Sequence, residues 1–176
     1  MRPFNPDGVL AYFISFRCYG TWLHGNDRGS MDRSAHHTYG APKISPNPLR
    51  TNYERSMHNS PAIRLSLSMR QLVERTIKEV CTHRGWHLYA ANAQDEHVHT
   101  VVYAKTDPER VMNSFKAWCT RRLRENPSLT LGLPHQPQPV WSRHGSTVWL
   151  WTEMQVSNAI NYTLNGQGEP PSTYQE

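Results

Sequence analysis

Two histidines separated by a single residue are the feature of this sequence that most directly suggests chemistry. His97 and His99 begin the segment His97–Tyr103, in which valine or threonine at 98, 100 and 102 alternates with the histidines and predicts a β-strand. Side chains two residues apart on a strand point to the same face, so both imidazoles project together. Neutral imidazoles side by side suit Mn, Zn, Fe, Co or Ni, with Mg as a weaker choice. The alternative is a half-exposed strand whose polar face carries two histidines without a metal.

A tyrosine near the C-terminus is the second candidate, because it lies off the apolar face of its helix. Thr152 and Gln155 have the spacing of a capping box, which predicts that a last helix begins there. The apolar stripe of that helix is Val156, Ala159, Ile160, Thr163 and Leu164. Tyr162 falls on the polar flank, which a helix laid across an open sheet face would bring to His97 and His99. A tyrosine at such a position is, taken alone, more often a packing residue.

A metal held by the histidines and a nearby phenol would together form a phosphoryl-transfer site. The metal would withdraw charge from the scissile phosphate. The tyrosine oxygen would attack phosphorus and hold the strand end covalently. A phenol needs a metal or a base nearby to become a good nucleophile. Tyr162 is therefore a catalytic candidate only together with His97 and His99.

The elements that must position these residues follow the order strand, helix, strand, strand, helix, strand, helix. Strands are predicted at 9–19, 86–92 and 97–103, with two strand segments at 140–142 and 147–151; helices are predicted at 60–84, 107–126 and 152–166. The first six match the β-α-β-β-α-β unit. We therefore expect an α+β, ferredoxin-like fold: a four-stranded antiparallel sheet with two helices on one face, and a C-terminal helix that carries Tyr162.

Composition and charge narrow the function classes. The 176 residues carry a net charge of +5, with a pI near 9.3 and a mean hydropathy of −0.72. This basic excess favours polyanion partners. No apolar run approaches the length of a membrane span and no signal region opens the chain, so we expect a cytoplasmic protein, nucleoid-associated in a prokaryote. Three cysteines without CxxC spacing argue against a disulfide framework and against structural zinc.

A single domain over residues 1–176 is expected, with a long loop insertion at about 20–60 and a flexible tail from about 168. A loop of this length is commonly functional or partly disordered, and a surface insertion without a role in the site is an equally good interpretation. The residues expected to contact DNA are Arg17, the loop residues Trp22, His24 and Arg28, and the helix residues Lys116, Arg121 and Arg124. The three helix cations form either a solvated face or a track for phosphates.

The histidine strand and the helix segment 159–167, Ala-Ile-Asn-Tyr-Thr-Leu-Asn-Gly-Gln, together resemble the single-tyrosine HUH transposases. That family includes transposases of small insertion sequences and REP-associated tyrosine transposases, and the order of elements agrees over roughly residues 9–167. The resemblance implies a metal-dependent endonuclease and strand transferase for single-stranded DNA next to a folded hairpin. In it, His97 and His99 would bind Mg²⁺ or Mn²⁺, and Tyr162 would form a 5′-phosphotyrosine intermediate and leave a free 3′-hydroxyl.

This sequence departs from the family pattern in two places. A polar residue about one turn after the tyrosine usually completes the metal shell, but position 166 is glycine, so the third ligand is Asn165 or Gln167, with Gln167 slightly favoured. Glu96 stands where many relatives have asparagine, and would either add a carboxylate ligand or cap the turn. Family members are commonly homodimers, some with the tyrosine helix serving the partner's histidines.

Two other functions remain open on the sequence. The first is a non-cleaving domain, derived from such an enzyme, that binds single-stranded or hairpin nucleic acid; the sheet topology is shared with RNA-recognition domains. The second is a structural protein whose histidines hold only a metal or a hydrogen-bond network. Valine at position 101 removes a third alternating histidine and argues against the histidine-triad hydrolases.

Overall fold

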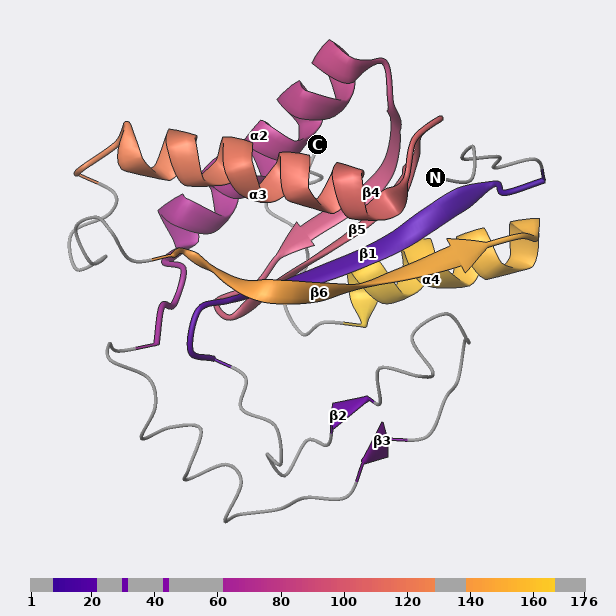
Figure 1. The fold of residues 1–176 in the computed structure, drawn as a ribbon, viewed down its shortest axis with the longest axis horizontal. Helices are drawn as coiled ribbons and strands as arrows, with labels where there is room; N and C mark the ends of the chain where they lie inside the picture. The colour runs from indigo at the N-terminus through magenta and orange to yellow at the C-terminus, as the bar shows by residue number, and fades with distance from the viewer. Residues whose placement is uncertain (1–7, 22–29, 32–42, 45–61, 129–138, 167–176) are drawn as a thin grey trace.

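A four-stranded antiparallel sheet with helices on both faces forms the body of the molecule (Figure 1). The computed structural model describes residues 8–21, 30–31, 43–44, 62–128 and 139–166. The elements of the sheet and its covering layers are β1 (Ala11–Cys18), α2 (Leu67–Arg84), β4 (His87–Ala93), β5 (His97–Tyr103), α3 (Pro108–Arg124), β6 (Trp141–Leu150) and α4 (Glu153–Asn165). Two short strands, β2 (Ser30–Met31) and β3 (Lys43–Ile44), pair with each other.

The strand order β4-β5-β1-β6 is that of the ferredoxin-like unit, so the predicted fold class is confirmed. Helices α2 and α3 cover one face, and α4 crosses the other (Figure 1). The main core fills the space under α2 and α3, where Tyr12, Ile14 and Phe16 of β1 are buried together with Val98 and Val102 of β5. None of the described helices is long and apolar enough to span a membrane.

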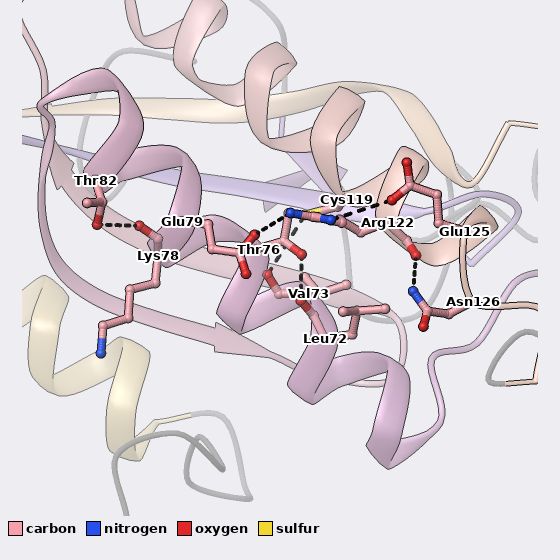
Figure 2. A network of polar contacts seen from close by, with 10 residues as sticks. All are labelled: Leu72, Val73, Thr76, Lys78, Glu79, Thr82, Cys119, Arg122, Glu125 and Asn126. Atoms are coloured by element: carbon pink, nitrogen blue, oxygen red, sulfur yellow. Dashed lines mark hydrogen bonds and ion pairs between the residues drawn. The ribbon is translucent and has the colours of Figure 1, made fainter.

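Contacts between α2 and α3 hold this helical layer together (Figure 2). The Arg122 guanidinium lies 3.0 Å from the Glu79 carboxylate, and the Cys119 thiol donates to the carbonyl oxygen of Val73 over 3.8 Å. The layer stabilises the sheet from the side opposite the two histidines.

The first helix begins later than the sequence pattern predicts. The helix starts at Leu67, after Ser66, whose hydroxyl accepts from the backbone N–H of Met69; Ser60 and Pro61 lie outside the described residues. Residues 62–66 stay outside the helix, because Ile63 and Leu65 are buried and their N–H groups donate to the carbonyls of Tyr19 and Asp95. These long-range contacts override the serine-proline start signal. The two predicted segments around 143–146 are likewise one continuous strand, β6.

Candidate active site

The histidine pair lies on a central strand, on the sheet face that α4 crosses. His97 and His99 face Arg17 and Ser15 of β1 in the antiparallel register. The two imidazole rings have centroids 4.8 Å apart; His99 is buried, and His97 is half-buried. The predicted strand, and the shared face of the two imidazoles, are therefore confirmed in the geometry.

The turn before the histidines forms ion pairs with one arginine, Arg64. The Arg64 guanidinium lies 2.8 Å from the Asp95 carboxylate and 2.5 Å from that of Glu96. The backbone N–H of Gln94 donates to the carbonyl oxygen of His97 and closes the hairpin. Of the two roles predicted for Glu96, the ion pair with Arg64 supports the role in the turn.

The tyrosine predicted on the polar flank of α4 packs against one of the two histidines, His99, of its own chain. Its ring lies edge-on to the ring of His99, with 5.7 Å between centroids, and the side chain of Tyr162 is 49% exposed. The capping box of Thr152 and Gln155 is present as predicted and fixes where α4 begins. About half of the surface of Tyr162 therefore remains exposed to solvent.

A phenylalanine that sequence reasoning missed joins these two rings. Phe13 stacks on His99 with 5.3 Å between centroids and 4° between planes, and meets Tyr162 edge-on at 5.9 Å. It lies on the same sheet face because it is two residues from Ser15, the partner of His99. Its place on that face could be found from strand alternation, but its contact with His99 depends on the strand register.

The last turn of α4 is tied to the sheet by a buried asparagine, which the sequence also did not reveal. Asn92 of β4 faces His99 in the register and has no exposed surface. Its amide nitrogen donates to the carbonyl oxygen of Thr163 over 2.8 Å, and its oxygen accepts from the amide of Gln94 over 2.8 Å. Apolar contacts complete the docking of α4; the residues involved are Ala11, Ala90, Val101, Leu150, Val156 and Ala159. The position of Tyr162 is thus fixed from two sides.

The donor set fits a divalent metal in part. Two imidazoles on one face suit Mn²⁺ and related ions. Within the described segments, no group of three or more His, Cys, Asp or Glu side chains gathers to hold a metal ion. Among the described residues, a metal at His97 and His99 would therefore need further ligands of another kind, such as amides, water or phosphate. Asn165 lies in the last turn of α4, where its amide nitrogen donates to the Asn161 side chain over 2.7 Å, and Gln167 lies outside the described residues.

The predicted DNA-contacting residues separate into three groups. Arg17 lies beside His97 on the adjoining strand. Arg121 and Arg124 are exposed on α3, in the layer on the opposite side of the sheet, and do not join the histidine–tyrosine cluster. The loop residues Trp22, His24 and Arg28 lie outside the described residues.

Lys116 differs from the other predicted contacts because its side chain points inward. The side chain is buried, and its ammonium donates to the carbonyl oxygens of Ser142, Arg143 and His144. Burial lowers the pKa of this ammonium from its usual value, and the carboxylate of Glu109 opposes that shift. The structure therefore does not place Lys116 on a surface track for phosphates, because its donors are already used inside the protein.

The sequence matches one family model, and the fold is similar to two solved structures. The family model described as "Transposase IS200 like" matches residues 50–143, a stretch that contains both histidines and ends before α4. Two solved structures are similar at 12% sequence identity. One is a REP-associated tyrosine transposase bound to a REP hairpin, with a TM-score of 0.45 and coverage of 90% of this chain and 66% of that one.

The other is a putative transposase from Deinococcus radiodurans R1, with a TM-score of 0.44 and 92% of each chain covered. This chain thus spans slightly less than two thirds of the hairpin-bound protein. No curated protein matches the sequence. The family match covers more than half of the chain and confirms the resemblance to single-tyrosine transposases; the chain belongs to the IS200-like transposase family.

Proposed function

We propose that this chain is a metal-dependent endonuclease and strand transferase for single-stranded DNA, which acts through a 5′-phosphotyrosine at Tyr162. The observation that carries the proposal is the edge-on contact between the phenol of Tyr162 and the imidazole of His99, within one chain. Membership of a transposase family supports the reaction class. The hairpin beside the cut site follows from the resemblance to single-tyrosine transposases.

In the proposed reaction, His97 and His99 would hold Mg²⁺ or Mn²⁺, with Gln167 or Asn165 as a third ligand. When bound, the metal would draw charge from the non-bridging oxygens of the scissile phosphate. The Tyr162 oxygen forms a bond to phosphorus and gives up its proton to solvent. The bond from phosphorus to the 3′-oxygen breaks, and that oxygen takes up a proton as a free hydroxyl. Attack by another 3′-hydroxyl reverses these steps and joins a new strand.

The surroundings of the phenol suit this role. Phe13 stacks on one face of His99, and Asn92 ties the carbonyl of Thr163, the residue next to Tyr162. These contacts hold the nucleophile and the histidines in one arrangement before DNA binds, which lowers the entropic cost of the reaction. We also propose a homodimer, in which Tyr162 packs on His99 of its own chain.

The test is formation of a covalent protein–DNA adduct. Labelled single strands with a stem-loop and randomised flanks are incubated with the protein and Mn²⁺ or Mg²⁺, and adducts are resolved on denaturing gels. Tyr162→Phe should abolish the adduct and keep DNA binding. Tyr89→Phe, an exposed tyrosine on β4, is the matched control and should behave as the wild type.

A non-cleaving nucleic-acid-binding domain is the second candidate. It is favoured by the absence, in the described part of the chain, of a third acidic, thiol or imidazole side chain beside the histidines. Binding of the stem-loop pool without any adduct, in both metals, would support this alternative and contradict the nuclease.

A further inference from the structure

The edge strand β6 has a β-bulge near its N-terminal end, where it pairs with β1. Phe16 pairs with Gly145 and Cys18 pairs with Trp141, so one residue of β1 faces the three residues 142–144 of β6. Bulges of this kind bend a strand and re-aim its side chains, and they are common beside functional sites. Here the side chains of Arg143 and His144 are exposed.

The bulge is held from inside the protein by Lys116. The ammonium of this α3 residue donates to the carbonyl oxygens of Ser142, Arg143 and His144 over 3.0, 3.4 and 3.1 Å. An ammonium has three N–H donors, so one lysine meets all three carbonyls. Burying this charge costs free energy that its hydrogen bonds must offset. These three hydrogen bonds hold the backbone of residues 142–144 in its bulged shape.

Close packing under the bulge fixes its backbone further. A Cβ atom added to Gly145 would lie 2.4 Å from the sulfur of Met112 and 2.6 Å from the carbonyl oxygen of Ser15. The Trp141 indole donates to the carbonyl oxygen of Lys116 over 3.1 Å, and the Ser142 hydroxyl donates to that of Cys18 over 3.1 Å. The carbonyls of residues 142–144 accept from Lys116 of α3, and the cationic side chain of Arg143 is left on the surface.

The bulge lies at the same end of the sheet as the histidines. His97 faces Arg17 in the register, and Arg17 is the β1 residue opposite the bulge. Neighbouring strands are about 4.8 Å apart, so two strand spacings place the bulge backbone about 10 Å from His97. β6 contains no acidic residue, and β1 contains none either. Arg17 and Arg143 are therefore the cations of β1 and β6 at this end of the sheet, while the carboxylates of Asp95 and Glu96 in the adjoining turn are paired with Arg64.

We propose that this Lys116-held bulge is a binding site for the phosphate backbone of single-stranded DNA. Arg143 binds a phosphate, and Lys116 acts as a positioning residue that contacts no DNA. The inference rests on the proposed function for the direction of the strand, which runs from the histidines across Arg17 to Arg143. It assigns the phosphate contact that the sequence predicted for Lys116 to the exposed Arg143 instead, and gives the buried Lys116 the task of positioning the bulge.

The test measures DNA binding in EDTA, so that cleavage plays no part. Anisotropy of a fluorescent single strand gives the affinity and its dependence on salt. Arg143→Ala should weaken binding about five- to tenfold at low salt and reduce the slope of log affinity against log salt by about 0.7, the value for one phosphate on a single strand. Arg143→Lys should keep the slope. Arg84→Ala, an exposed arginine at the end of α2, is the matched control and should change neither quantity.

The role of Lys116 is tested by a double-mutant cycle. Lys116→Met should weaken binding as much as Arg143→Ala, and the double variant should bind no more weakly than either single one, because both changes disable the same contact. Multiplied effects and a doubled loss of slope would mean that Lys116 binds phosphate directly and would overturn its assignment. If Lys116→Met does not fold, as judged by circular dichroism, comparison of Arg143→Ala with Arg143→Lys still decides whether the bulge binds phosphate.

Failure of this inference is distinguishable from failure of the proposed function. An unchanged affinity and slope in Arg143→Ala overturns the binding site, even if Tyr162 forms its adduct. A loss of affinity for duplex DNA with no loss for the single strand overturns it as well. Dependence of single-strand binding on Arg143, together with no adduct in any metal, supports the binding site and contradicts the nuclease.

Discussion

The phenol ring of Tyr162 meets the imidazole ring of His99 edge-on, with 5.7 Å between their centroids, and both rings belong to one chain. Phe13 contacts both and closes a cluster of three rings on the sheet face that α4 crosses. The helix reaches this face because its apolar residues Val156 and Ala159 are buried against the strands. The geometry of the cluster follows from ordinary packing of an amphipathic helix on an open sheet.

Asn92 should control how firmly the end of α4 is docked. Asn92→Ala removes the donor to the Thr163 carbonyl and the acceptor for the Gln94 amide, and should lower the free energy of unfolding by about 1–3 kcal/mol. Amide hydrogen exchange in the last turn of α4 should rise. Chemical denaturation and exchange mass spectrometry measure both effects.

Asn158→Ala is the matched control, because this asparagine is exposed on the same helix and should change stability by less than about 0.5 kcal/mol. Equal stabilities and equal exchange rates for the two variants would contradict a docking role for Asn92.

Metal binding should depend on both histidines. Mn²⁺ titrated into the protein should bind, and His97→Ala or His99→Ala should each weaken its affinity by at least about tenfold, since each removes a ligand. His87→Ala, on the exposed part of β4, is the control. Affinity should also fall as the pH is lowered, because a protonated imidazole has no lone pair for the metal. Calorimetry that shows the same Mn²⁺ affinity in all three variants would exclude the histidines as ligands.

Gly145 should tolerate no larger side chain. Alanine there would bring Cβ against the Met112 sulfur and the backbone oxygen of Ser15, and the backbone oxygen cannot move without disturbing β1. Gly145→Ala should therefore cost about 1–3 kcal/mol through overpacking. At Gly85 nothing lies within 4 Å of the added Cβ, and the cost of about 1 kcal/mol arises from its φ of +66° alone. A smaller loss at Gly145 than at Gly85 would show that the bulge is loosely packed.

The cysteines should be unreactive in the folded protein. Burial raises the pKa of the Cys18 and Cys81 thiols to about 12, with Asp95 and Glu96 adding to the shift at Cys18, and burial raises the pKa of Cys119 too. The thiols of the unfolded chain ionise near 9, so their contribution to stability is complete below that pH and is lost as the pH rises toward 12. At pH 8 a disulfide reagent should label none of them until guanidinium unfolds the chain. Rapid labelling of the native protein would contradict their burial.

Local patterns were enough to predict the parts of the site that depend on one element. Alternation placed His97 and His99 on one strand face, and the capping box of Thr152 and Gln155 placed Tyr162 on its helix. Their roles in phosphoryl transfer were inferred from the residue types and positions, the family resemblance added the 5′-phosphotyrosine, and both stay proposals. The match to the transposase family agrees with that resemblance.

Features that depend on contacts between elements could not be predicted in this way. Asn92 and Phe13 acquire their roles only through the register of β4 and β1 with β5. Lys116 lies on an amphipathic helix, where a cation normally indicates a solvent face. The three carbonyls that accept from it belong to the bulge of β6, which the sequence does not reveal. The start of α2 differs from the prediction because long-range hydrogen bonds of Ile63 and Leu65 keep residues 62–66 out of the helix.

The chemical identity of the covalent link is the most direct test of the central claim. Adducts formed with Mn²⁺ are digested with nuclease and protease, and the nucleotide-bearing peptide is sequenced by mass spectrometry. The account predicts a 5′-phosphate ester on Tyr162, in the peptide that contains residues 159–166. A nucleotide attached to any other residue, or no adduct with either metal on strands that the protein binds, would contradict it.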